Sequence, residues 1–153
     1  MNFEEAMAIA IKVAKEATLA SGDVPVGAVI LNSKLEVVAT GSNERELAHD
    51  PTAHAEIVAM RKASTELGSW RLEGHTLVVT LEPCAMCAGA IVQSRILRVV
   101  FGAWDEKAGA VGSVWDILRD PRTLNKPEVI SGVLAAECAQ LLQSFFQGQR
   151  KGN

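Results

Sequence analysis

The sequence predicts an α/β protein in which helices cover both faces of a mixed β-sheet. Segments with helical and strand-like patterns follow one another in the order αββαβαβ(loop)βα. The first two strand-like runs are separated by only three residues, which indicates an antiparallel hairpin. Two later runs are mostly apolar, as is typical of strands that are buried on both faces.

Four segments carry the signals of helices. Asn2 followed by Glu5 is a capping box ahead of apolar residues with helical spacing. Asp50 and the two residues after it are a typical helix start, and Gly68 is a typical helix end. The expected helices cover residues 2–20, 50–68, 83–94 and 134–146.

Five segments rich in apolar and β-branched residues are expected to be strands. They cover residues 24–31, 35–42, 75–82, 96–102 and 128–132. Residues 103–127, between the last two, have no regular pattern. Loops of this length are usually either functional or poorly ordered.

Length and composition predict a single domain over residues 1–153. Hydrophobic residues make up 48% of the chain and charged residues 22%, which excludes a disordered chain. The longest stretches without a charged residue contain 12 residues, too few to cross a bilayer. Because the first ten residues are acidic rather than basic, we expect no secretory signal, no membrane partner and a cytoplasmic location.

The net charge of −3 removes the simplest argument for nucleic-acid binding, which is a strongly basic surface. Arg119, Arg122 and Lys126 lie close together and could form a local basic patch. A solvated loop that carries a few cations explains them equally well. Charge alone therefore leaves a nucleic-acid partner open.

The strongest chemical signal comes from His54, Cys84 and Cys87, which lie at the starts of two predicted helices. The cysteines are three residues apart, so a helix would place both thiols on one face. These residues supply three metal ligands, whereas structural zinc sites have four. The set therefore predicts one catalytic zinc ion that holds a water molecule at its fourth position.

Glu56 lies two residues after His54, and positions two apart point to opposite sides of a helix. Both side chains can face one ion only if the ion lies ahead of the first helical turn. Two helices that point their amino termini at the ion would each contribute about +0.5 of a charge. These charges would keep the thiols ionised and offset the negative charge of a bound hydroxide.

Other interpretations of these residues are also open. A CxxC pair at a helix start is typical of thioredoxin-like redox proteins, although the His-Ala-Glu motif favours a metal site. In isolation, His54 could be a capping or core residue, and Glu56 could be an acidic first-turn residue that the helix dipole favours. Cys138, His49 and His75 lack a comparable context, so we expect Cys138 to pack on the last helix and the two histidines to be structural or exposed.

The motif pair H-x-E and P-C-x-x-C is the signature of zinc-dependent nucleobase deaminases. Over nearly the whole chain, the sequence resembles one branch of this superfamily, the bacterial tRNA-specific adenosine deaminases. The resemblance rests on DPTAHAEI (50–57), TLEPCAMCAGAI (80–91), SRILRVVFGAWDEKAGAVGS (94–113) and LAAECAQLLQSFF (134–146). It implies a three-layer α/β/α sandwich with a five-stranded mixed sheet, the cytidine deaminase-like fold. It also implies a homodimer, for which residues 89–92 could form the interface or simply pack in the core.

The resemblance implies that the protein converts adenosine to inosine at the wobble position of a tRNA anticodon, with arginine tRNA as the expected substrate. One zinc ion per subunit, held by His54, Cys84 and Cys87, would polarise a water molecule. Glu56 would take a proton from this water, pass it to the adenine ring and later protonate the departing ammonia.

The resemblance also assigns substrate contacts to five residues. The backbone amide of Ala55 and the side chain of Asn43 would hold the flipped base. Asp105 would contact the neighbouring sugar or backbone. Val26 and Phe146 would line the pocket, although ordinary core packing also explains them.

Two features depart from the family pattern. Trp104 stands where an arginine or a small polar residue is expected, and it could stack on a base or cover the loop. The tail contains only Arg150 and Lys151 as basic residues, so we expect it to contribute little to RNA binding.

Two other functions fit parts of the sequence. A deaminase of free guanine, cytosine or cytidine would use the same zinc site, and the acidic net charge favours it. Residues 101–113 and Asn43 favour tRNA. A zinc-stabilised binding module without catalysis is disfavoured by Glu56 and by the three-ligand count.

Overall fold

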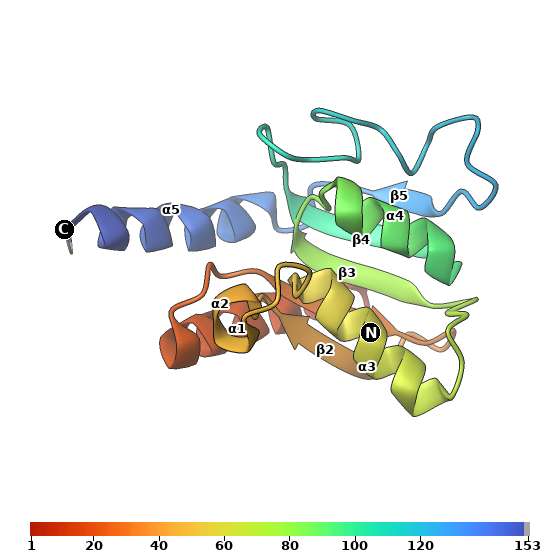
Figure 1. Cartoon of the computed structure of the whole chain (residues 1–153), viewed down its shortest axis with the longest axis horizontal. Coiled ribbons are helices and arrows are strands. Elements are labelled where there is room, and N and C mark those ends of the chain that lie inside the picture. Colours follow the sequence, from red (N-terminus) through yellow and green to blue (C-terminus); the bar gives the residue numbers. More distant parts are fainter. Residues whose placement is uncertain (152–153) are drawn as a thin grey trace.

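The computed structural model describes residues 1–151, with side chains up to residue 149, so the side chains of Arg150 and Lys151 lie outside the described part. A five-stranded sheet in the order β2-β1-β3-β4-β5 forms the centre (Figure 1). The strands are β1 (Gly27–Leu31), β2 (Val37–Ser42), β3 (Thr76–Leu81), β4 (Arg98–Ala103) and β5 (Glu128–Ile130). β1 runs antiparallel to β2 and β3, whereas β3, β4 and β5 are parallel. The predicted mixed sheet is confirmed.

Helices cover both faces of this sheet, which confirms the predicted three-layer sandwich. They are α1 (Phe3–Ser21), α2 (Arg45–Ala48), α3 (Ala55–Leu67), α4 (Ala85–Ser94) and α5 (Ala135–Lys151). α3 and α4 lie side by side on one face, and α1 lies on the other (Figure 1). α5 starts against β4 and then projects beyond the sheet (Figure 1).

Two apolar clusters fill the space between the layers. On the side of α3 and α4, Ile30 and Phe101 pack with residues of both helices. On the side of α1, the neighbouring residues Val29 and Val100 pack with α1 and with Cys138 of α5. Successive residues of β1 and β4 therefore enter opposite clusters, as expected for strands buried on both faces. The prediction that Cys138 lies on the apolar, packed face of the last helix is confirmed.

A glycine in β2 brings the start of α3 close to the sheet. A Cβ atom at Gly41 would lie 2.6 Å from the carbonyl oxygen of Ala55 and 2.5 Å from the backbone nitrogen of Ala59. Only glycine allows this approach, because the neighbouring atoms belong to the backbone. The first turn of α3, which directly follows His54, is thereby placed against β2.

Two local features differ from the sequence prediction. α2 is not expected from the sequence, because four residues are too few to show a periodic pattern. α3 begins at Ala55 rather than at residues 50–52. The Asp50 side chain accepts hydrogen bonds from the backbone and hydroxyl groups of Thr52, so these residues form a turn ahead of the helix.

Two of the three cations of the predicted patch are paired with nearby acids, Arg119 and Arg122. Arg119 lies 3.0 Å from Asp116, and Arg122 lies 2.6 Å from Asp120. These two arginines therefore do not form a free basic patch. Within the described residues, no helix combines the length and the apolar character needed to cross a membrane.

Candidate catalytic metal site

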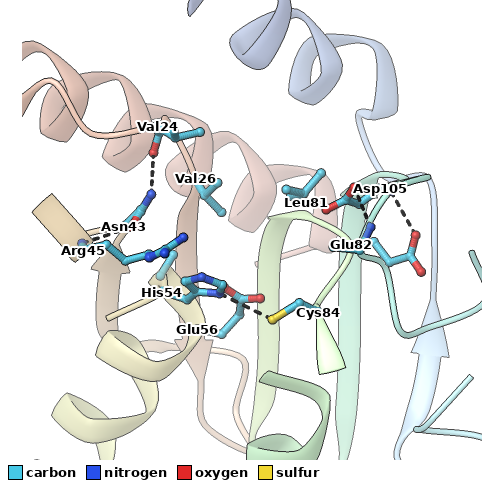
Figure 2. Close-up of a pocket in the computed structure, with 12 residues that line it drawn as sticks. Val24, Val26, Asn43, Arg45, His54, Glu56, Leu81, Glu82, Cys84 and Asp105 are labelled. Carbon is cyan, nitrogen blue, oxygen red and sulfur yellow. Dashed lines mark hydrogen bonds between the residues drawn. The ribbon is translucent and has the colours of Figure 1, made fainter. Parts of the chain in front are cut away.

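Three side chains that can bind a metal ion meet where β3 leads into α4. His54 is the N-cap residue of α3, and Cys84 is the N-cap residue of α4 (Figure 2). Cys87 lies in the first turn of α4. The ligand atoms of these three residues all lie within 4.8 Å of one another. The fold therefore brings together the three residues that the sequence singles out.

The distances fit a tetrahedral zinc ion. The Nδ1 atom of His54 lies 3.5 Å from the Sγ atom of Cys84 and 3.5 Å from that of Cys87. In a tetrahedral site with ordinary bond lengths, nitrogen and sulfur ligands are about 3.6 Å apart. The distances from the histidine nitrogen to both sulfurs therefore suit zinc, and three protein ligands are typical of a catalytic ion.

The two helix starts favour negative charge at this position. Neither His54 nor Cys84 forms a side-chain capping hydrogen bond to its own helix. The first-turn N–H groups of α3 and α4 are thus left uncapped by these side chains, and the positive ends of both helix dipoles meet at the ligands. This arrangement agrees with the expectation that an ion lies ahead of both helices.

The three ligands share protons with one another. The hydrogen bond with Cys87, together with one from His54, lowers the pKa of Cys84 to about 3, although burial opposes the shift. The hydrogen bond with Cys84 raises the pKa of His54 and also raises the pKa of Cys87. Cys84 is therefore a thiolate at neutral pH, which is the form that binds zinc.

Glu56 is the second residue of α3, and only 4% of its surface is exposed. Burial raises the pKa of its carboxyl group to about 6, while its own backbone N–H and the charge of His54 oppose this shift. A carboxyl group with such a pKa can accept and release protons near neutral pH. Glu56 therefore has the properties of a proton carrier.

A cavity of about 190 Å³ opens above the metal ligands (Figure 2). His54, Cys84 and Glu56 form its floor. Asn43 lies in one wall, next to the start of α2, and Asp105 lies in the opposite wall, on the loop after β4. The cavity can therefore admit a small ring system whose reacting atom faces the metal ligands.

A buried carboxylate from another part of the chain holds the α2 wall. Asp23 is 3% exposed and accepts hydrogen bonds from the backbone N–H groups of Glu46 and Leu47 at 2.9 and 3.2 Å. Asp23 thus caps the short helix from outside it. The side chain of Asn43 donates a hydrogen bond to the carbonyl oxygen of Val24 at 3.3 Å, which ties this wall to the segment before β1.

A second buried carboxylate holds the opposite wall, which we call the 105–113 loop. Glu82 is 2% exposed. Its oxygens accept hydrogen bonds from the backbone N–H groups of Asp105, Val111 and Ser113 at 3.0, 3.0 and 3.1 Å, and from the Ser113 hydroxyl. Burial alone would raise the pKa of Glu82, but these hydrogen bonds hold it below its ordinary value.

The structure brings most of the residues assigned to substrate contacts into the cavity. Those that line it are Val26, Asn43, Ala55 and Asp105. Phe146 is 47% exposed and lies beside a separate hollow formed by α5 residues, because α5 projects away from the sheet. Trp104 is 49% exposed and packs edge to face on Phe101, with ring centres 4.8 Å apart.

Sequence reasoning missed several residues that line the cavity: Val24, Arg45, Leu81, Glu82 and Ala108. Arg45 has no local signal, because it looks like any exposed cation in the sequence. Glu82 does have a local signal in the sequence. An acidic residue at the end of an apolar strand run has to find hydrogen-bond donors inside the protein.

Known proteins share this fold and its motifs. Residues 1–103 match the family described as the cytidine and deoxycytidylate deaminase zinc-binding region. The chain is 49% identical to a tRNA-specific adenosine deaminase of Bacillus subtilis over 142 residues, which cover 93% of this chain and 87% of that protein. A solved structure from studies of A-to-I editing by tRNA:A34 deaminases at the wobble position of transfer RNA has a TM-score of 0.85 and 40% identity, with coverage of 90% of this chain and 99% of that chain. A guanine deaminase of Bacillus subtilis has a TM-score of 0.67 and 31% identity, with coverage of 99% and 95%.

Proposed function

The chain belongs to the zinc-binding cytidine and deoxycytidylate deaminase family, and on this premise we propose that it converts adenosine to inosine at the wobble position of a tRNA anticodon. Water replaces the amino group of adenine, and ammonia leaves. The observation that carries the proposal is the difference between two relatives from one organism. The chain is 49% identical to the tRNA-specific adenosine deaminase of Bacillus subtilis but 31% identical to its guanine deaminase.

The enzyme is a zinc-dependent deaminase, and we assign His54, Cys84 and Cys87 as the zinc ligands. When bound, zinc supplies a Lewis acid that makes water a stronger nucleophile. Glu56 accepts a proton from the attacking water and donates a proton to the adenine ring nitrogen beside the amino-bearing carbon. It then takes the remaining proton of the added hydroxyl group and gives it to the amino group, which leaves as ammonia. The pKa of Glu56, about 6, suits transfer in both directions.

The cavity above the ligands receives the adenine base after it has been flipped out of the anticodon loop. Flipping costs less in a loop than in a duplex, which suits an anticodon target. The side chain of Asn43 and the backbone N–H of Ala55 bond to the base, and Val26 packs against it. Asp105 in the opposite wall contacts the neighbouring nucleotide. Arg45 adds a cation beside Asn43, which suits an RNA phosphate in a protein of net charge −3.

The partner is tRNA, and arginine tRNA is the proposed substrate. The enzyme acts in the cytoplasm, where bacterial tRNA is matured, and the whole chain forms one domain.

The proposed enzyme is a homodimer that associates through α3 and α4, where Met60, Trp70 and Ala90 line a half-open hollow. Sedimentation of the wild type and of Trp70→Glu tests this interface. A variant that dimerises as tightly as the wild type would rule out this face.

The test of the function is a panel of substrates: unmodified arginine tRNA, free adenosine, cytidine and guanine. Mass spectrometry of the products should find inosine in the tRNA and no conversion of the free compounds. Glu56→Ala protein, purified in the same way, controls for contaminating deaminases. Product from guanine or cytidine with unchanged tRNA would replace the proposal by a free-base or nucleoside deaminase. A zinc-loaded protein that converts none of the four would instead be a binding module.

A further inference from the structure

Glu82 is the most heavily hydrogen-bonded buried side chain that the proposed chemistry does not use. It lies between the end of β3 and the zinc ligand Cys84. Each of its oxygens accepts two hydrogen bonds, and all four donors belong to Asp105, Val111 or Ser113. A carboxylate offers about four acceptor positions, so those of Glu82 are filled. Glu82 therefore has no free acceptor for substrate or metal and acts only through the residues that it holds.

The donors to Glu82 come from both ends of the 105–113 loop. Asp105 begins the loop and lines the cavity, whereas Ser113 ends it. The middle of the loop lies directly on the carboxylate, since a Cβ atom at Gly109 would lie 2.2 to 2.4 Å from the carboxyl atoms of Glu82. The whole wall of the cavity is therefore folded around one charged group.

The same loop is bonded to the backbone beside the zinc ligands. The N–H group of Ala110 donates a hydrogen bond to the carbonyl oxygen of Pro83 at 2.8 Å, and Gly109 forms a β-bridge with Cys84. These contacts set the distance between Cys84 and Asp105, which lie at the floor and in the wall of one cavity. A loop attached in this way can align substrate relative to the metal ligands without touching substrate at Glu82.

We propose that Glu82 is a positioning residue, which sets the affinity for the nucleotide beside the reacting base by holding Asp105 and the rest of the 105–113 loop in place. This role rests on the proposed action on tRNA. A neutral side chain of the same shape cannot replace Glu82, because the amide group of glutamine would direct N–H donors at the N–H donors of the loop.

The test compares Glu82→Gln with Glu106→Gln, which removes the same charge from an exposed side chain of the same loop. The KM for tRNA should rise about tenfold or more in Glu82→Gln, because hydrogen bonds to a charged group are lost. We expect kcat to fall much less, the zinc content to remain at one per chain, and Glu106→Gln to behave as wild type. Hydrogen exchange at the amides of Asp105, Val111 and Ser113 should become faster in Glu82→Gln only.

Two further variants keep the test decisive. Ser113→Ala removes one donor and leaves the carboxylate in place, so it should give a smaller rise in KM even if Glu82→Gln fails to fold. Asp105→Ala should raise KM, and adding Glu82→Gln to it should cause little further change, because both act through one contact. An unchanged KM in both Glu82→Gln and Ser113→Ala would overturn the positioning role. So would a fall in kcat alone that matches the fraction of the variant protein that is unfolded.

The proposed function and the role of Glu82 fail in different ways. If the wild type makes no inosine in tRNA, the function is wrong, and hydrogen exchange then decides whether Glu82 holds the loop. If the wild type is active and the Glu82 variants match it in KM and in exchange, only the role of Glu82 is wrong.

Discussion

Glu56 and Glu82 are two buried glutamates beside one cavity, and their surroundings give them opposite properties. Both side chains are almost inaccessible to solvent, at 4% and 2% exposed. Burial raises the pKa of Glu56 to about 6. It acts in the same direction on Glu82, but hydrogen bonds from the 105–113 loop outweigh it and lower the pKa. Burial and donated hydrogen bonds thus act in opposite directions on the pKa of a carboxyl group, and at Glu82 the hydrogen bonds outweigh burial.

This difference assigns different tasks to the two regions. The start of α3 leaves Glu56 with few donors, which suits a group that must alternate between its charged and neutral forms. The junction of β3 and α4 surrounds Glu82 with donors, which suits a group that must remain charged and hold a loop. Three experiments test this contrast in addition to the glutamine substitution at Glu82.

The largest effect is expected at Glu56. Glu56→Gln keeps the shape of the side chain but removes its ability to accept a proton, so kcat should fall by about 10²- to 10⁴-fold. Single-turnover assays of inosine formation measure this change, and zinc content and tRNA affinity should stay near those of the wild type. Glu66→Gln, an exposed change on the same helix, is the control. A Glu56→Gln enzyme that keeps wild-type turnover would show that another group moves the proton.

A smaller effect is expected from crowding Glu82. Gly109→Ala places a methyl group within 2.4 Å of the Glu82 carboxylate, so the loop must shift. We expect the free energy of unfolding to fall by about 1–3 kcal/mol, as for overpacked sites, and this can be measured by urea titration. Gly148→Ala on α5 is the control, because its added methyl group would meet nothing within 4 Å apart from the nearby backbone of its own helix. Equal stability of the two variants would mean that the loop does not depend on its contact with Glu82.

The smallest effect concerns Cys84, which lies two residues after Glu82 but shares protons with the Glu56 side of the site. After zinc is removed with a chelator, iodoacetamide should modify Cys84 at least about tenfold faster than Cys138 at pH 7. The pKa of Cys84 is lowered to about 3, mainly by its hydrogen bond with Cys87, whereas burial raises the pKa of Cys138 to about 11. Peptide mass spectrometry gives the order of modification. In zinc-loaded protein, Cys84 should resist modification by iodoacetamide. If Cys138 were modified before Cys84 in the zinc-free protein, Cys84 would not be the more reactive thiolate.

Much of the fold could be predicted from local patterns. The strand runs alternate with helical segments, and the capping and glycine signals are read within a few residues. The metal residues could also be predicted, because His54 and Glu56 lie two apart and Cys84 and Cys87 lie three apart. The inference that the ion lies ahead of two helices followed from helix geometry, and His54 and Cys84 are indeed N-cap residues.

The walls of the cavity could not be predicted in the same way. Asp23 caps a helix that begins more than twenty residues later, and Glu82 bonds to a loop that begins 23 residues after it. Phe146 was expected in the pocket from its position in a motif, but the direction of α5 places it elsewhere. Such placements depend on how distant elements pack, which short patterns do not encode.

The amino-acid order alone determined the kind of elements, the three residues proposed as metal ligands and the presence of an acidic residue near them, because these follow from residue type and short spacing. Only the tertiary structure shows that one buried glutamate faces the candidate metal ligands with few donors and that the other is bonded to the 105–113 loop. The reason is physical: the pKa and the free acceptors of a carboxylate depend on donors that the fold brings from distant parts of the chain.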